Sequence, residues 1–258
     1  MNNSSRVIKK RKEDPILNHT RQVKTFIGAI IVAGATAAGC AGFLSHAFHG
    51  YLCLAVLTLA AATSRMKVKL PGIDSNMSVN LPFLLTAVVN LSAVETILVT
   101  CVSTAVQCWP KKNAKFNPEQ MTFNLSMMVF AISLASLAFH AEWPWRTQFS
   151  SIAMGLVLPT ASLFFAQTAP VAGIVAVSEG KVAGSIWWSL AHLSFPYYVL
   201  SIGVTSMVQA MSSHLGWALA LAVFPVTYGI HRSYRIYFGQ MAEALALKVM
   251  VTPVGTRA

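Results

Sequence analysis

The chain has 258 residues, of which 55% are hydrophobic and only 10% are charged, whereas about 25% of the residues of a soluble domain are charged. So few charges cannot cover the surface of a soluble fold of this length, so the composition indicates an integral membrane protein. The net charge is +11, but the basic residues occur in short stretches between apolar segments. That pattern argues against a nucleic-acid binder, which carries its basic and aromatic residues on one folded face.

The first 24 residues are polar and basic. The apolar stretch that follows them is longer than the core of a cleavable signal peptide and leads into further apolar segments. We therefore expect residues 1–24 to form a disordered cytoplasmic tail. The four cysteines include no CxxC pair, so no zinc or redox site is expected and no cofactor is predicted.

Eight apolar segments follow the tail, and an isolated membrane-spanning helix needs about 20 of its residues to be apolar. The segments cover residues 26–48, 51–64, 81–90, 93–109, 121–140, 149–177, 185–211 and 215–237. They predict an all-α, polytopic transmembrane bundle over residues 25–240, with eight spans and seven as the alternative. Residues 241–258 are expected to form a short cytoplasmic tail, in which residues 241–250 continue the last helix.

The third and fourth segments are predicted to form a short helical hairpin at 81–109. A single helix over these residues would carry Asn90, Ser92 and Glu95 near its middle. A break at residues 90–92 places these polar groups at a turn instead. Short segments of this kind are tolerated when they pack inside a bundle or line a cavity.

The basic residues predict the orientation of the chain. With eight crossings and the N-terminus on the cytoplasmic side, 18 of the 19 lysines and arginines fall on that side and only Arg146 falls outside. Fusing the third and fourth segments would move Lys111, Lys112 and Lys115 to the outside. The positive-inside rule therefore favours eight crossings with both ends in the cytoplasm.

Two parts of the chain resemble a known bacterial family. Residues 64–108 read SRMKVKLPGIDSNMSVNLPFLLTAVVNLSAVETILVTCVSTAVQC, and residues 224–239 read FPVTYGIHRSYRIYFG. Both resemble the N-terminal membrane sensor domain that precedes HD-GYP phosphodiesterase and GGDEF cyclase modules. In that family a loop containing "lPG" leads into a short apolar hairpin that ends in "VQ". A later "P..Y...R.Y..Y" helix carries the signal into the cytoplasmic module.

This resemblance implies a sensor-like domain in the bacterial inner membrane that binds a small molecule within the bundle. The chain ends at Ala258, about 20 residues after the last predicted span, which leaves no room for a catalytic module. We therefore expect no enzymatic activity and a signal passed to a separate cytoplasmic or membrane partner. The residues expected to carry that output are Arg232, Tyr234 and Arg235.

A second resemblance supports an alternative function. The predicted hairpin followed by residues 119–124, which read EQMTFN, is similar to the layout of the S-components of energy-coupling-factor vitamin transporters. This resemblance implies a small-molecule transporter subunit that depends on a coupling partner. A third alternative, an intramembrane enzyme, lacks a recognisable nucleophile and base.

The loop over residues 71–80 is rich in hydrogen-bonding groups and runs directly into the hairpin. It can fold into the bundle and bind a polar ligand, because irregular backbone near a short span often lines a cavity. It can equally be an ordinary loop whose Gly, Asn, Ser and Asp residues make turns and caps. The ligand-binding candidates in this loop are Asp74, Ser75, Asn76, Ser78 and Asn80.

Three further candidates lie in the apolar segments. Glu95 is an ionisable group in an apolar stretch, which is a functional hypothesis by default. It also stands three positions after Ser92, in the pattern of a capping box. His192 is the deepest ionisable side chain in the prediction. It either binds a ligand or relays a proton, or it is a neutral, buried histidine that donates to a neighbouring helix. Asn124 and the glutamines Gln107, Gln167 and Gln209 either bind a ligand or join helices.

Four histidines map to the predicted outer side together with Glu142, namely His46, His49, His140 and His214. They are weak candidates for a metal site or a pH sensor. The alternative is that they are interfacial histidines that never meet, and on that ground no metal is predicted. Small residues over 28–42 form a stripe that permits close helix packing within the chain or with a partner.

Overall fold

The computed structural model describes residues 15–44, 48–69, 76–110, 116–141, 152–215 and 218–251. Within them it contains eight helices and one two-stranded antiparallel hairpin. The helices are α1 (Pro15–Leu44), α2 (Gly50–Ser64), α3 (Leu81–Asn90), α4 (Ala93–Cys108), α5 (Pro118–His140), α6 (Ile152–Glu179), α7 (Ala183–Leu215) and α8 (Ala218–Val251). The strands are β1 (Lys67–Lys69) and β2 (Asn76–Ser78).

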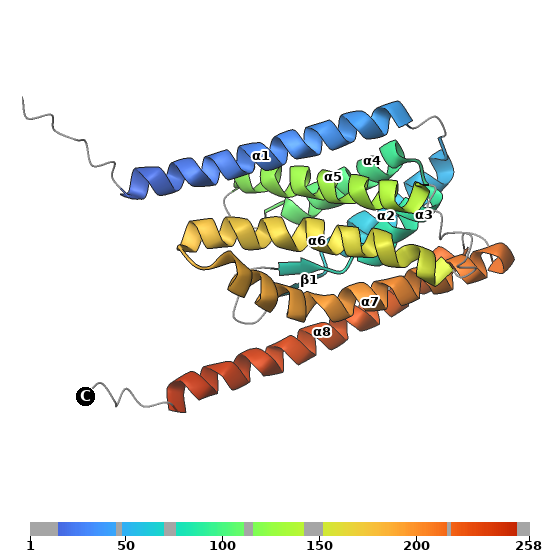
Figure 1. The fold of residues 1–258 in the computed structure, drawn as a ribbon. Helices are drawn as coiled ribbons and strands as arrows, with labels where there is room; N and C mark the ends of the chain where they lie inside the picture. Colours follow the sequence, from blue (N-terminus) through green and yellow to red (C-terminus); the bar gives the residue numbers. More distant parts are fainter. Residues whose placement is uncertain are drawn as a thin grey trace, which may run out of the picture.

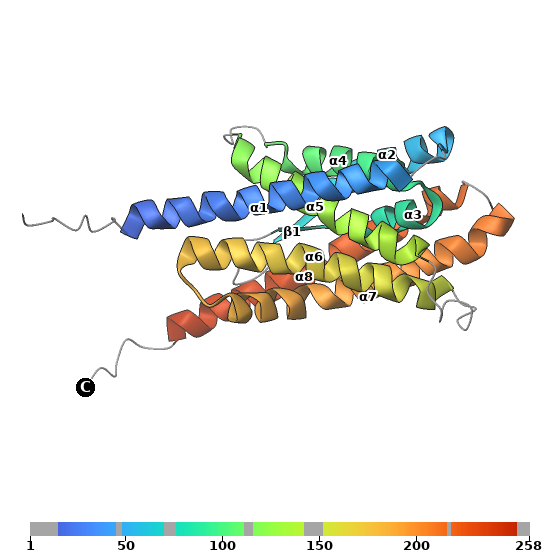
Figure 2. The same cartoon turned by 45° about the horizontal axis from the view of Figure 1, so that its top comes forward.

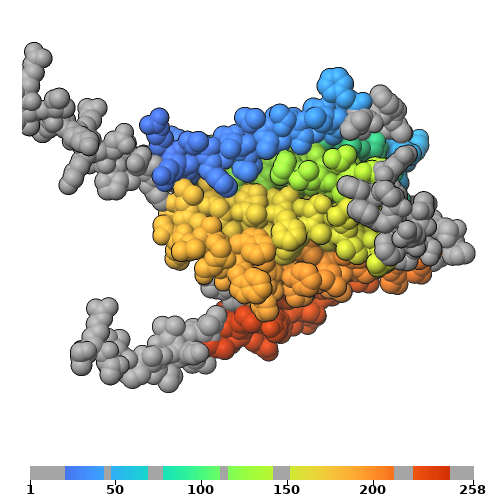
Figure 3. Space-filling view, in the orientation of Figure 1, coloured from blue at the N-terminus to red at the C-terminus, as the bar shows by residue number. Residues whose placement is uncertain are grey.

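The long helices lie side by side, with α1, α5 and α7 running in one direction and α6 and α8 in the other (Figures 1 and 2). The start of α1, the turn between α6 and α7, and the end of α8 lie at one end of the bundle, on the left of Figure 1. We call this the terminal end. The turn between α3 and α4 and the start of α6 lie at the opposite end. In space-filling view, α1, α5, α6, α7 and α8 form successive bands across one face (Figure 3).

Among the described residues, three helical segments are long and apolar enough to cross a membrane: Arg21–Phe43 within α1, α5 and α6. Three shorter helices, α2, α3 and α4, are apolar as well. The chain is therefore an all-α protein with several candidate membrane-spanning helices, which indicates contact with a lipid bilayer and more than one crossing.

The break predicted between residues 90 and 92 is confirmed. α3 ends at Asn90, and α4 begins at Ala93 with Ser92 as its N-cap. α3 is 10 residues long, which corresponds to about 15 Å and is too short to cross a bilayer. It is tolerated because most of its side chains are buried among other helices rather than exposed to lipid.

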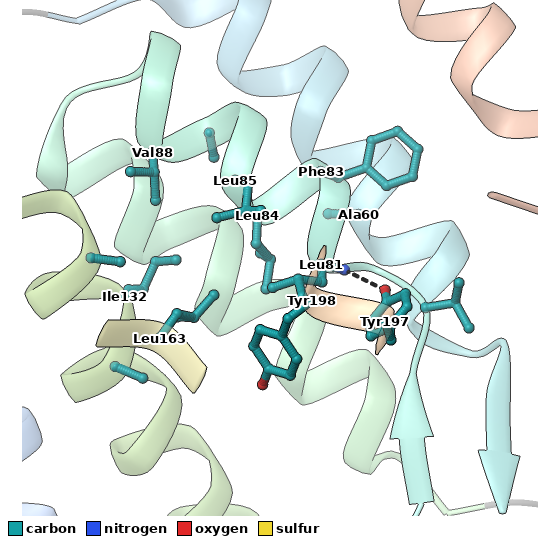
Figure 4. Close-up of a cluster of buried hydrophobic side chains, with 14 of the residues drawn as sticks. Ala60, Leu81, Phe83, Leu84, Leu85, Val88, Ile132, Leu163, Tyr197 and Tyr198 are labelled. Carbon is teal, nitrogen blue, oxygen red and sulfur yellow. Dashed lines mark hydrogen bonds between the residues drawn. The ribbon is translucent and has the colours of Figure 1, made fainter. Parts of the chain in front are cut away.

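The core forms around α3. Leu84, Leu85 and Val88 of α3 meet Ile132 of α5 and Leu163 of α6, and all five side chains are almost fully buried (Figure 4). Tyr197 and Tyr198 of α7 close the same cluster, and the backbone N–H of Leu81 donates a hydrogen bond to the Tyr197 hydroxyl oxygen at 3.1 Å. This bond is important because Leu81 opens α3, where backbone N–H groups have no partner within the helix.

The small-residue stripe on α1 packs closely within the chain at Gly34. A Cβ atom placed on Gly34 would lie 2.5 Å from the backbone oxygen of Ser126 on α5, closer than any carbon can approach an oxygen without displacement. Gly34 therefore lets α1 and α5 approach closely. At Gly28 and Gly39 a Cβ atom would meet nothing within 4 Å.

The structure differs from the sequence-based predictions at two places and agrees with them at a third. α1 begins at Pro15, so the prediction of a disordered tail is wrong for residues 15–24; proline suits the first turn of a helix because that position needs no N–H donor. The two strands within residues 65–80 were predicted as loop. Residues 241–250, predicted to continue the last helix, are helical, and α8 ends at Val251.

Candidate functional site

A pocket of about 680 Å³ lies between α7 and α8, with one wall from α6. Pockets that bind small molecules have volumes of about 300 to 1,000 Å³. Seven of the lining side chains are aromatic: Phe164, Trp187, Trp188, Phe195, Tyr234, Tyr237 and Phe238. The remaining lining residues are Ala191, His192, Leu193, Pro196, Ser233 and Met241.

Helical spacing brings these side chains together. On α7, Trp187, Ala191 and Phe195 recur every four residues, so they occupy one helix face. On α8, Tyr234, Phe238 and Met241 recur at intervals of four and three residues, which also places them on one face. The two faces meet across the pocket, and the small side chain of Ala191 leaves room between them.

The inner wall of the pocket is held in place by its neighbours. The Trp187 indole N–H donates to the Thr168 hydroxyl at 3.1 Å, and its ring stacks on Phe165 with centroids 5.9 Å apart. Phe164 packs edge-on against both Phe195 and Tyr198. These contacts hold the inner wall in place without a ligand, so the pocket is largely formed before a ligand binds.

The outer wall is open. The residues Trp188, Phe195 and Tyr237 are 69%, 58% and 56% exposed. None of the described residues that line the pocket is Asp, Glu, Lys or Arg. The pocket thus offers flat apolar surfaces with a few hydrogen-bonding groups, among them His192, Ser233 and the two tyrosine hydroxyls.

His192 and Tyr234 were predicted for different roles and lie in the same pocket. His192 is exposed on the surface of α7, so its alternative as a buried histidine is wrong. Apart from Tyr234, the aromatic residues of the site were not predicted. Their spacing at residues 187–195 and 234–238 is visible in the sequence, but every face of an apolar helix shows such spacing.

A series of contacts joins the pocket to α3. The Tyr234 ring lies 6.1 Å from the Tyr197 ring, centroid to centroid, and edge-on to it. Tyr197 is 2% exposed and accepts the hydrogen bond from the Leu81 N–H. The pocket residue Tyr234 therefore contacts the residue that bonds to the start of α3.

Glu95 lies in the first turn of α4, at the end of the bundle opposite the terminal end, and is 1% exposed. One carboxylate oxygen accepts from the backbone N–H and the hydroxyl of Ser92, at 3.0 and 2.8 Å. The other accepts from the backbone N–H of His49 at 2.5 Å, and the His49 imidazole Nδ1 lies 3.7 Å from the carboxylate. The capping box predicted for Ser92 and Glu95 is confirmed.

The other ligand-binding candidates do not gather at one site. The Ser78 hydroxyl donates to the backbone oxygen of Ser64 at 3.0 Å, and the Asn124 amide donates to the Cys108 sulfur at 3.4 Å. Asn80 is buried at the start of α3. Asp74, Ser75 and the side chain of Asn76 lie outside the described residues.

Two of the predicted amides join helices, as one of the two interpretations expected. The Tyr198 hydroxyl of α7 donates to the Gln167 carbonyl of α6 at 2.6 Å. The side-chain amide of Gln209 on α7 donates to the side-chain oxygen of Asn90 on α3 at 2.9 Å. Such bonds across helices are the usual role of amides in a membrane bundle.

The predicted outer histidines are not assembled into a metal site within the described part of the chain, which contains no group of three or more metal-binding side chains. His49 lies beside Glu95, and the His140 Nε2 atom lies 3.0 Å from the Val88 backbone oxygen. The side chains of His46 and His214 lie outside the described residues. Arg232 and Arg235, predicted to carry the output, are exposed on α8.

No protein-family model, no curated protein and no solved structure matches this chain. The sequence resemblances therefore stay predictions. The functional assignment depends on the pocket between α7 and α8 and on the charges along the chain.

Proposed function

We propose that this chain is a non-enzymatic membrane sensor that binds a small molecule in the pocket between α7 and α8. The observation that carries the proposal is the arrangement of α8. One face of this helix contributes Tyr234, Tyr237 and Phe238 to the pocket, while Arg232 and Arg235 are exposed. A single helix therefore combines a ligand-contacting face with a basic surface available to a partner.

The proposal includes a topology of eight crossings with both ends in the cytoplasm of a bacterial cell. It is supported by the start of α1 and the end of α8, which lie at the same end of the bundle (Figure 1). It is also supported by the distribution of charge, which puts 18 of 19 lysines and arginines on the cytoplasmic side. α3 is then a partial crossing buried inside the bundle.

A molecule bound beside α8 has a direct route to the partner. α8 packs against α7, β1 and α2, whereas α5 and α6 are packed by long helices on both sides. A ligand between α7 and α8 separates or tightens the two helices, and helix shifts of 1 to 2 Å are a common form of switching. The exposed arginines move with α8, and the partner senses their new position.

The alternative is a carrier of the S-component type, which uses the same pocket to move its ligand across the membrane. The two functions differ in whether the bound ligand crosses the membrane. A sensor reconstituted in vesicles binds its ligand without accumulating it, whereas a carrier with its coupling partner accumulates it. Accumulation of the bound molecule in vesicles would contradict the sensor.

The binding site can be tested with a substitution that fills the pocket with a larger side chain. Protein purified in lipid nanodiscs is analysed by native mass spectrometry for a bound molecule that is not a bulk phospholipid. We expect Ala191→Phe to remove that molecule, because the new ring occupies the space between α7 and α8. The matched control, Ala169→Phe on the exposed face of α6, is expected to retain it. Equal amounts in both variants would refute the α7–α8 site.

A further inference from the structure

We infer that the ligand is a quinone dissolved in the membrane, with its ring in the α7–α8 pocket and its tail in the lipid. This inference rests on the proposed function, because it names the ligand class of the same site. It draws on three properties of the pocket: the direction of its opening, the shape of its walls and the position of its polar groups.

The opening faces the surroundings of the bundle. Trp188, Phe195 and Tyr237 form its rim and are more than half exposed, and α7 and α8 are the last two bands on the visible face (Figure 3). In the proposed topology, Trp188 and Phe195 of α7 border lipid, whereas Tyr237 follows Arg235 along α8 and lies toward the cytoplasmic surface. The ligand therefore enters sideways and carries an apolar part that can stay in the hydrocarbon.

The absence of Lys and Arg from the described lining decides against anionic headgroups. A carboxylate or phosphate placed among these residues would lose its hydration without gaining a basic partner, which is costly. The part of the ligand inside the pocket is therefore not anionic.

The walls favour a flat ring over an alkyl chain. Aromatic side chains from three helices line the pocket, and pairs of them pack edge-on to each other. Aromatic rings gain about 0.5 to 1.5 kcal/mol from stacked or edge-on contact beyond the burial of area. An alkyl chain gains only the burial term.

The polar groups stand on opposite walls. His192 belongs to α7 and Ser233 to α8, and each can donate a hydrogen bond to a carbonyl oxygen. A ring that carries carbonyl oxygens on opposite edges matches this arrangement. A quinone with an alkyl or prenyl tail combines the flat ring, the two acceptors and the apolar tail.

The test uses decylubiquinone as the probe and decylbenzene as its match without carbonyl groups. Both are titrated into the full chain in nanodiscs, and binding is followed by native mass spectrometry. We expect decylubiquinone to bind about tenfold or more tightly than decylbenzene, since one net hydrogen bond changes affinity by about that factor. Equal binding of the two probes would overturn the inference, because the pocket would then select only an apolar body.

Variants at His192 and Ser233 test whether these two donors cause the preference for decylubiquinone over decylbenzene. His192→Leu is expected to weaken decylubiquinone binding about tenfold and leave decylbenzene binding unchanged, whereas His192→Gln retains a donor and stays within about threefold. Ser233→Ala is expected to act in the same direction, with Ser189→Ala as the control on the exposed part of α7. If decylubiquinone fails to bind while Ala191→Phe still removes a different molecule, the quinone inference is wrong and the proposed sensor site stands.

Discussion

His49 is the N-cap residue of α2, and its backbone N–H donates a hydrogen bond to the carboxylate of Glu95 on α4 at 2.5 Å. Glu95 also accepts two hydrogen bonds from Ser92, the N-cap of α4. One buried carboxylate therefore stabilises the first turns of two helices. Helix N-termini attract negative charge because their N–H groups lack partners.

Replacing Glu95 tests this role. Glu95→Ala leaves the His49 and Ser92 donors without their acceptor, and we expect it to lower the free energy of unfolding by about 2 to 4 kcal/mol. Unfolding in mixed detergent measures the loss. Glu119→Ala, at the exposed first turn of α5, serves as the control and is expected to change stability by less than about 0.5 kcal/mol. Unchanged stability together with lost ligand binding in Glu95→Ala would instead indicate a ligand-binding role.

The hairpin formed by α3 and α4 could be predicted because its signals are local. The polar residues Asn90 and Ser92 interrupt an apolar stretch, and Glu95 follows Ser92 at capping-box spacing. Such patterns depend only on neighbouring residues, so they predict a helix end and a helix start regardless of the tertiary fold. The end of α2 and the start of α5 were likewise close to their predicted positions.

The pocket could not be predicted, since it depends on which faces of α7 and α8 meet. In a soluble helix the apolar face marks the core, but a helix in lipid is apolar all round, so hydrophobic periodicity does not orient it. The position of His192 within its segment does not show which way its side chain points, so its exposure on α7 could not be predicted. The strands β1 and β2 have three residues each, too few for an alternating pattern to be recognised.

The close approach of α1 and α5 gives a second prediction. Gly34→Leu places side-chain atoms where the Ser126 backbone lies, so α1 must move away from α5. We expect reduced thermal stability and loss of a disulfide engineered between these two helices. Gly28→Leu is the matched control, because a side chain there meets open space. Equal behaviour of the two variants would show that α1 does not pack on α5 through Gly34.

Tyr197 gives a third prediction. Tyr197→Phe keeps the ring but removes the oxygen that accepts from the Leu81 N–H, leaving a buried donor unpaired. The expected loss is about 1 to 3 kcal/mol of unfolding free energy, measured as for Glu95. Tyr228→Phe, on the exposed side of α8, is expected to have no effect. If the two variants lose equal stability, the bond to α3 contributes nothing.

The proposed topology gives a fourth prediction. In a chain whose exposed Cys40 is replaced by Ser, a cysteine at Tyr51 should react with a membrane-impermeant thiol reagent in intact cells. Cysteines at Lys181 and Asn113 should react only after the membrane is opened. Lys181 lies in the turn between α6 and α7 at the terminal end. Labelling of position 113 in intact cells would contradict eight crossings.

The most direct test of the central claim is whether occupation of the pocket moves α8. Spin labels at Glu179→Cys on α6 and Glu243→Cys on α8, both exposed, report the distance between these helices by pulsed electron paramagnetic resonance. Decylubiquinone is predicted to shift the distance distribution in the chain with a native pocket and to leave it unchanged in Ala191→Phe. If saturating ligand leaves the distribution of the native pocket unchanged, α8 does not carry the signal and the account is contradicted.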